Sequence, residues 1–134
     1  MKFKSSIIVS TLFLCATLGT PIKGPSATYA PAVTLTPSTL TFTCYHYYGN
    51  CGTSASGLVT LKNSGNAVLR ITSIVISGYL FSGSSTCGTS LGAGLSCPIY
   101  VHWKPTFGAH TGTVKVTDNA TNSPQTVQLV GYYR

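Results

Sequence analysis

Apolar and polar residues alternate in short runs along most of the chain, and residues that favour turns separate these runs. The run CPIYVHW at residues 97–103 is a clear example, because every second residue from Cys97 to Trp103 is apolar. A period of two is typical of a β-strand with one buried face, and no helical periodicity appears after residue 32. The pattern predicts an all-β domain with these core residues: Val59, Leu61, Leu69, Ile71, Ile74, Ile76, Phe81, Cys97, Ile99, Val101, Trp103, Val114, Val116, Val127 and Leu129.

The alternation changes phase near the start of the domain. Val33 and Leu35 lie on one face, whereas Leu40 and Phe42 resume the pattern out of phase after Pro37. Proline in a sheet is confined to edges, strand starts and irregularities. The break therefore predicts a first strand that switches between two sheets, with the proline at the switch.

A second change of phase falls between Ile71 and Ile74. It predicts a β-bulge near Thr72 and Ser73, where one extra residue shifts the alternation. We count about seven strands over about 100 residues, separated by turn signals at the spacing of a β-sandwich. The predicted fold is an immunoglobulin-like β-sandwich filling residues 33–134, and a small barrel is the alternative.

Residues 1–32 are expected to be a secretory signal peptide. MKFK supplies positive charge, and SIIVSTLFLCATLG is an apolar run of signal-peptide length that is short for a membrane span. Cleavage after Ala32 is plausible, and a cut near Gly19 or Gly24 is the alternative. Lipid attachment at Cys15 is a rival interpretation, but the leucine before it is larger than the residue that lipoprotein processing favours. We therefore expect an exported product with no membrane span.

Charge is sparse and almost entirely positive. Eight Lys and Arg residues oppose a single acid, which gives a net charge of +7. Without residues 1–32, five basic residues oppose Asp118, and the net charge falls to +4. Because Lys and Arg form no run, solubility explains this charge more simply than a nucleic-acid partner does.

Four cysteines remain after the signal peptide, namely Cys44, Cys51, Cys87 and Cys97. An even number of cysteines in an exported chain implies disulfides. Three pairings are possible, and the two short local loops, Cys44–Cys51 and Cys87–Cys97, are the simplest. Each such loop would contribute about 2.5 kcal/mol by restricting the unfolded chain.

Several segments resemble, in order and spacing, the bacterial choice-of-anchor D domains, which are akin to ASH (ASPM–SPD-2–Hydin) and major-sperm-protein-like domains. They are NSG, VLRITSIVISG, CGTSLGAGLSC, PTFGAHTGTV and SPQTVQLVG, and the resemblance covers residues 33–131. It implies an immunoglobulin-like sandwich of an exported bacterial protein, extracellular or periplasmic, with a non-catalytic role in binding, adhesion or scaffolding. The Cys87–Cys97 hairpin agrees with the family pattern. Relatives have a plain connection where this chain has CYHYYGNC, so the resemblance assigns no function to that segment.

Residues for common catalytic and metal sites are missing or poorly spaced. A single acid excludes paired catalytic carboxylates, and Asp118 lies in TDNATNSP, where capping its own turn is its ordinary role. No GxSxG or phosphate-binding glycine motif is present. Cys44, His46 and Cys51 are conceivable metal ligands, but their spacing differs from common zinc sites and exported thiols oxidise. We expect no enzymatic activity, no metal and no cofactor.

Two groups of residues are candidates for binding. The first lies in the cysteine-bounded loop and comprises Tyr45, His46, Tyr47 and Tyr48. Tyrosine offers a large contact area at a low cost in conformational entropy, although the loop is alternatively only a stiffened turn. The second is an outward row on one strand, comprising Tyr100, His102 and Lys104, beside Leu58, Thr60 and Lys62. Such a row can stack on sugars or anionic polymers, and a solvated sheet face is its alternative interpretation.

These features favour an exported module that binds or adheres to a protein or a cell-surface glycan. The alternative is a structural component that self-associates through exposed strand edges. Tyr132, Tyr133 and Arg134 would lengthen one such edge, at the end of the last strand.

Overall fold

The computed structural model describes residues 19, 24, 26–48 and 52–134, so Cys51 and most of the predicted signal peptide lie outside the described residues. The described residues form nine strands and one short 3-10 helix. The elements are β1 (Val33–Thr36), β2 (Thr39–Cys44), η1 (His46–Tyr48), β3 (Ala55–Asn63), β4 (Leu69–Gly78), β5 (Phe81–Ser85), β6 (Ser90–Leu91), β7 (Ser96–Trp103), β8 (Gly108–Asp118) and β9 (Gln125–Tyr133). Within this part of the chain, no helix has the length and apolar character that crossing a membrane requires.

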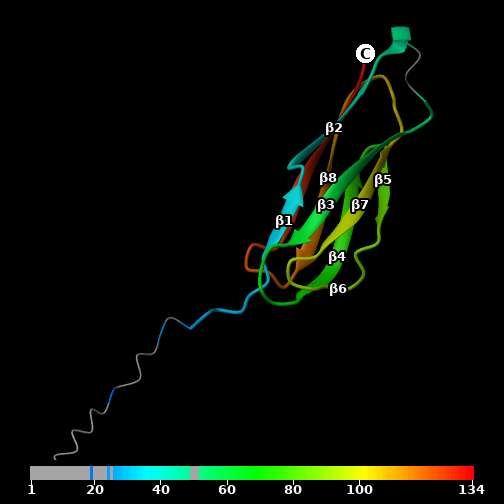
Figure 1. The fold of residues 1–134 in the computed structure, drawn as a ribbon. Helices are drawn as coiled ribbons and strands as arrows, with labels where there is room; N and C mark the ends of the chain where they lie inside the picture. The colour runs from blue at the N-terminus through cyan, green and yellow to red at the C-terminus, as the bar shows by residue number, and fades with distance from the viewer. Residues whose placement is uncertain (1–18, 20–23, 25, 49–51) are drawn as a thin grey trace, which may run out of the picture.

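The strands form two sheets that lie face to face, as Figure 1 shows. The first has the order β1-β3-β7-β5, and the second has the order β2-β9-β8-β4-β6. All pairs are antiparallel except β2 with β9, which is parallel. The predicted immunoglobulin-like β-sandwich is confirmed. It has more strands than the sequence predicts because the first strand is divided and because β6, with two residues, is too short to show an alternation.

The predicted switch of the first strand between the two sheets is also confirmed. β1 pairs with β3 in the first sheet, and β2 pairs with β9 in the second. The peptide bond between them, Thr36–Pro37, is cis. One continuous segment therefore contributes a strand to each sheet on the same side of the sandwich.

The predicted bulge in β4 lies between Ile71 and Ser73, where the register with β8 shifts. Beyond it, Ile74 and Ile76 face the core as predicted, but they are half-buried instead of buried. β6 pairs with β4 only at Leu69 and Arg70, so the second half of β4 is an edge of its sheet. Alternation identifies the face on which a residue lies, but it does not reveal how close the strand is to an edge.

The remaining predicted core residues are buried between the sheets. Trp103 of β7 is fully buried, and its ring centroid lies 6.1 Å from that of Phe42 and 6.2 Å from that of Phe81. Gly131 of β9 faces this indole so closely that a Cβ atom there would lie 2.6 Å from Trp103 Cζ2. The two sheets therefore approach each other through a large ring on one side and a glycine on the other.

Asn63, the last residue of β3, is fully buried and makes hydrogen bonds with every polar group that it has. Its Nδ2 donates to the carbonyl oxygens of Ala67 at 2.8 Å and of Leu91 at 3.0 Å, and its Oδ1 accepts from Gly65 N at 3.1 Å. Its backbone N–H donates to Leu95 O and its carbonyl accepts from Gly94 N, both at 2.9 Å. Asn63 therefore joins the turn after β3 to the loop between β6 and β7.

Cys87 and Cys97 form a disulfide, as the local pairing predicts. The bond closes the segment that contains β6 and fixes it to the start of β7. Cys44 is disulfide-bonded as well, and its predicted partner, Cys51, lies outside the described residues.

Candidate functional site

One end of the sandwich carries a cluster of aromatic side chains, which we call the aromatic end. It consists of His46, Tyr47, Phe107, Tyr132, Tyr133 and Arg134, which come from η1, the β7–β8 loop and the end of β9. Strand pairing brings them together, because Tyr133 lies opposite Gly108 of β8 on one side and opposite Cys44 of β2 on the other. Figure 1 shows the C-terminus and η1 side by side at this end.

Backbone hydrogen bonds fix the start of η1 to the end of the chain. Arg134 N donates to Cys44 O at 3.0 Å, and His46 N donates to Arg134 O at 2.7 Å. These bonds continue the parallel pairing of β2 and β9 beyond the two strands. The backbone position of His46 is therefore set by sheet structure.

Tyr133 is the centre of the ring contacts. The His46 ring is stacked on it, with a centroid distance of 6.2 Å and an interplanar angle of 26°. Phe107, from the β7–β8 loop, contacts Tyr133 at a centroid distance of 5.8 Å, and Tyr47 meets His46 edge-on at 6.2 Å. The order of contacts is thus Tyr47, His46, Tyr133 and Phe107, which makes a continuous aromatic surface from segments far apart in the sequence.

This surface is open to solvent. Tyr47 is 95% exposed and Phe107 is 75% exposed. A cavity of about 400 Å³ lies beside Phe107 and is lined by Phe107, Gly108, Ala109, Tyr132, Tyr133 and Arg134. The Arg134 guanidinium lies over the Tyr132 ring, 5.2 Å from its centroid, in a cation–π contact. Exposed apolar patches of this kind are typical of interaction sites.

Only some of the binding residues predicted in the cysteine-bounded loop belong to this surface. His46 and Tyr47 belong to the aromatic end, and Tyr45 is exposed next to them. The side chain of Tyr48 lies outside the described part of the structure. Phe107 was not among the predicted binding residues, although an aromatic residue within the turn-rich segment KPTFG was a usable signal.

The second predicted group lies elsewhere, on the outer face of the first sheet. Tyr100 is exposed opposite Leu58, and His102 Nδ1 lies 2.9 Å from Ser56 Oγ. Lys104 follows the end of β7, where its backbone N–H donates to Leu80 O at 3.0 Å. The predicted neighbours Thr60 and Lys62 lie opposite Pro98 and Ser96 instead, so they are further along the sheet. Tyr100 and His102 remain a second candidate surface that is separate from the aromatic end.

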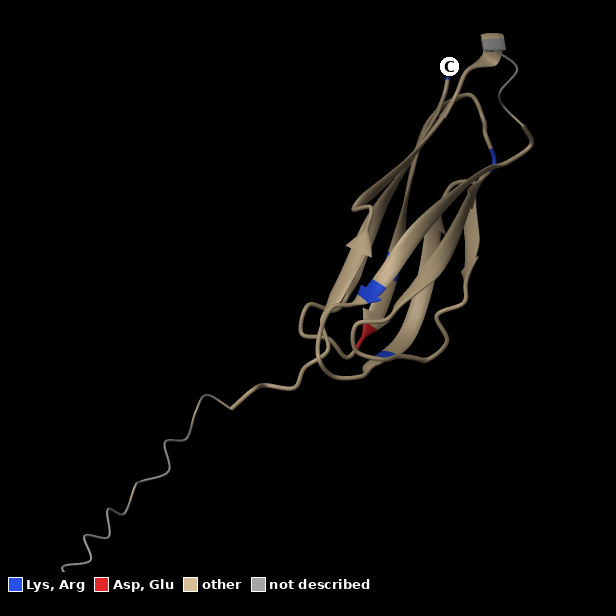
Figure 2. Ribbon diagram, viewed as in Figure 1, with Lys and Arg blue, Asp and Glu red and all other residues tan. Residues whose placement is uncertain are grey.

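Asp118 caps its own turn, as predicted, because its Oδ1 accepts from Ala120 N at 2.8 Å. It ends β8, whereas Gly108 at the aromatic end begins it. The two positions are ten residues apart, or about 33 Å along a strand. Figure 2 shows the acidic residue near the end of the sandwich that is distant from the C-terminus. Among the described residues, no three His, Cys, Asp or Glu side chains are grouped in a way that could hold a metal ion.

No protein-family model and no curated protein sequence matches the chain. Solved structures do match. A protein of unknown function from Porphyromonas gingivalis W83 has a TM-score of 0.65 at 13% identity, over 82% of this chain and 51% of that one. The ASH/PapD-like domain 7 of human CEP192 has a TM-score of 0.57 at 14% identity, over 100% and 98%. The secreted serine protease VesC from Vibrio cholerae has a TM-score of 0.56 at 12% identity, over 78% of this chain and 23% of that one.

The chain has the immunoglobulin-like fold of ASH/PapD-like domains. At these identities, the similarity shows the fold alone. The chain spans about half of the Porphyromonas gingivalis protein and less than a quarter of VesC. Any indication of function therefore lies in the surface residues of this chain.

Proposed function

We propose that the chain is an exported, non-catalytic binding module whose aromatic end captures a protein or a cell-surface glycan. The observation that carries this proposal is the continuous surface of Tyr47, His46, Tyr133 and Phe107, with its two outer rings largely exposed. An apolar surface of this kind gains free energy when a ligand covers it. Rigid aromatic side chains lose little conformational entropy on binding, so more of that gain becomes affinity.

The scaffold supports the same proposal. Loops at the end of a rigid sandwich commonly carry binding residues. Here the backbone bonds of Cys44, His46 and Arg134 hold the start of η1 in place before any ligand arrives. The disulfides also support export, since disulfides persist in oxidising compartments. We propose an extracellular or periplasmic location and membership of the bacterial choice-of-anchor D domains, supported by the sequence segments described above.

Alanine at Tyr47 and Phe107 together is expected to weaken binding at least ten-fold, because the change removes both outer rings. The unfolding temperature should stay within about 2 °C, since exposed side chains contribute little to stability. Binding is measured on a glycan array and on intact cells with labelled protein. Leu95→Ala is the matched control, because Leu95 is an exposed apolar residue outside the aromatic end.

Tyr100→Ala separates the two candidate surfaces. Its binding should equal that of the unaltered protein if the aromatic end is the site. A loss of binding with Tyr100→Ala and none with the Tyr47 and Phe107 double variant would assign the site to the sheet face instead. Retention of full binding in both variants would contradict both assignments.

The position of signal cleavage leads to a separate expectation. Ala30 N donates to Asn66 Oδ1 at 2.9 Å, and Ala32 O accepts from Ser64 N at 2.8 Å, so residues just before β1 pair with the turn after β3. A cut near Gly19 or Gly24 keeps these bonds, whereas a cut after Ala32 removes them. We therefore expect the intact mass of the secreted protein to correspond to an N-terminus before Ala30. A mass that begins at Val33 would contradict this expectation.

A further inference from the structure

The side of the sandwich opposite the β1–β2 switch is open, because each sheet ends there in a strand edge. β5 is the last strand of the first sheet. In the second sheet, β6 pairs only with Leu69 and Arg70 of β4. Among the described strands, none pairs with residues 72–78 of β4 on the side away from β8. Backbone groups along this stretch are therefore available to another strand.

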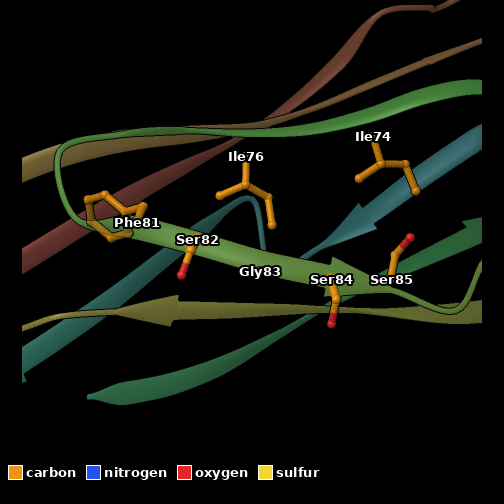
Figure 3. A pocket seen from close by; sticks show the side chains of 7 residues that line it. All are labelled: Ile74, Ile76, Phe81, Ser82, Gly83, Ser84 and Ser85. Carbon is orange, nitrogen blue, oxygen red and sulfur yellow. The ribbon is translucent and has the colours of Figure 1, made fainter. Parts of the chain in front are cut away.

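A groove of about 320 Å³ runs between these two edges, and its lining residues are Ile74, Ile76, Phe81, Ser82, Gly83, Ser84 and Ser85. Figure 3 shows Ile74 and Ile76 pointing from β4 toward β5. β5 passes close to β4 at its middle position, because a Cβ atom at Gly83 would clash with Tyr100 O and lie 2.5 Å from Ile76 Cδ1. The two isoleucines pack only partly against the core and stay half-buried, so a strand placed beside β4 could cover the rest of each side chain.

The free edge of β4 lacks the features that usually prevent pairing. Natural edge strands carry lysine, proline, bulges or inward charges. Residues 72–78 contain no charged residue and no proline, and β-branched residues predominate at their centre. The bulge lies at the start of this stretch, so residues 73–78 keep a regular register with β8. Val75, on the outer face, is 50% exposed.

We propose that two copies of this chain pair antiparallel along β4, about a two-fold axis at Val75. The stretch is self-complementary in this register. Ile74 of one copy lies opposite Ile76 of the other on the inner face, above the groove. Val75 lies opposite Val75 on the outer face. Each copy thus covers the half-exposed isoleucines of its partner and supplies partners for the free backbone groups.

We call this β4–β4 interface between the two copies the seam. The charges near it are compatible with a second copy. Charge is sparse but almost entirely positive, so an interface that brought Lys or Arg residues of two copies together would be unfavourable. Lys115 is opposite Val75 on β8. In the paired sheets, the two Lys115 residues would be three strand spacings apart, or about 14 Å. That exceeds the screening length of about 8 Å at physiological salt. Arg70 of each copy lies beyond the end of its partner's β4.

The seam is short, which determines how the dimer should behave. Seven paired residues extend over about 23 Å, so the interface falls below the roughly 1,200 Å² of stable complexes. We therefore expect reversible association with a dissociation constant in the micromolar range. The seam shares no residue with the aromatic end, so failure of either proposal leaves the other standing.

Sedimentation equilibrium of the secreted, disulfide-bonded protein tests the seam. Between about 1 and 500 μM, the mass should rise from that of a monomer to that of a dimer. Val75→Lys should weaken association at least ten-fold, because it places two lysines directly opposite each other. Val68→Lys is the matched control and should associate like the unaltered protein, since Val68 is 55% exposed and precedes β4. A monomer at every concentration, or a dimer that Val75→Lys leaves intact, would overturn the proposal.

Cross-linking provides a second readout that does not depend on a weak equilibrium. At the two-fold axis the Cβ atoms of residue 75 should be about 5 Å apart, which is close to disulfide geometry. Val75→Cys should form a covalent dimer under mild oxidation, and Val68→Cys should not. Equal cross-linking of both variants, or a ladder of larger species, would overturn the proposal, because two-fold pairing closes at the dimer.

Discussion

Replacing Asn63 with alanine should lower the free energy of unfolding by about 3 kcal/mol. The side chain is fully buried and has two donor bonds and one acceptor bond. Truncation leaves the carbonyls of Ala67 and Leu91 and the N–H of Gly65 without these partners. Each buried polar group that loses its partner costs about 1–3 kcal/mol, reduced where water can reach it.

The measurement is guanidinium chloride denaturation of the disulfide-intact protein. Asn66→Ala is the matched control, because Asn66 is exposed in the same turn and accepts one bond, from Ala30 N. We expect its cost to stay below about 1 kcal/mol. Asn63→Asp adds a further comparison, since it keeps an acceptor for Gly65 but removes both donors. Equal losses for the two alanine variants would show that burial of the Asn63 network does not matter.

Replacing Gly131 with alanine should cost about 2–3 kcal/mol, through overpacking. The added methyl group would lie 2.6 Å from Trp103 Cζ2 and 2.8 Å from Cδ2. The indole cannot retreat easily, because the rings of Phe42 and Phe81 contact it. The sheets must therefore separate locally or the indole must leave its preferred position.

Thermal and chemical denaturation measure this cost, and near-ultraviolet circular dichroism reports the environment of Trp103. Gly52→Ala is the control, since the nearest atom to a Cβ there is Ser54 O at 3.8 Å. Combining Gly131→Ala with Trp103→Phe should cost less than the sum of the two single changes, because the smaller ring leaves room for the methyl group. Additive costs would contradict a direct contact between residues 103 and 131.

The sequence predicted most of the architecture because a buried sheet face imposes a local pattern. Alternation alone identified the inward residues of β3, β7, β8 and β9, and its interruptions located the switch at Pro37 and the bulge before Ser73. The half-burial of Ile74 was missed, because the order of strands in a sheet is a non-local property. The same holds for the Asn63 network, whose partners come from different loops.

The aromatic end was only partly predictable, for a related reason. The unusual composition of CYHYYGNC drew attention to His46 and Tyr47. Nothing in that segment indicates Tyr133 or Phe107, which reach it through the parallel pairing of β2 with β9 and the register of β9 with β8. A surface assembled from three distant segments becomes visible only when the strand register is known.

The two proposals together have a consequence for how the protein would act. Antiparallel pairing along β4 reverses the long axis of the second copy, so the two aromatic ends would point in opposite directions. Such a dimer would connect two separate surfaces. It would gain little avidity on a single surface, because its two binding sites could not both face that surface. Agglutination of ligand-bearing beads by the unaltered protein, but not by Val75→Lys, is the expected behaviour.

The hydrogen bonds that join Arg134 to Cys44 and His46 also bear on how the protein is handled. Any sequence fused after Arg134 would emerge beside Tyr133 and the cavity next to it. A purification tag or sensor-chip linker at that position would cover the aromatic end. Measured binding would then be lost even if the protein itself were able to bind. Attachment through the exposed turn near Asn119, at the far end of β8, leaves the aromatic rings free.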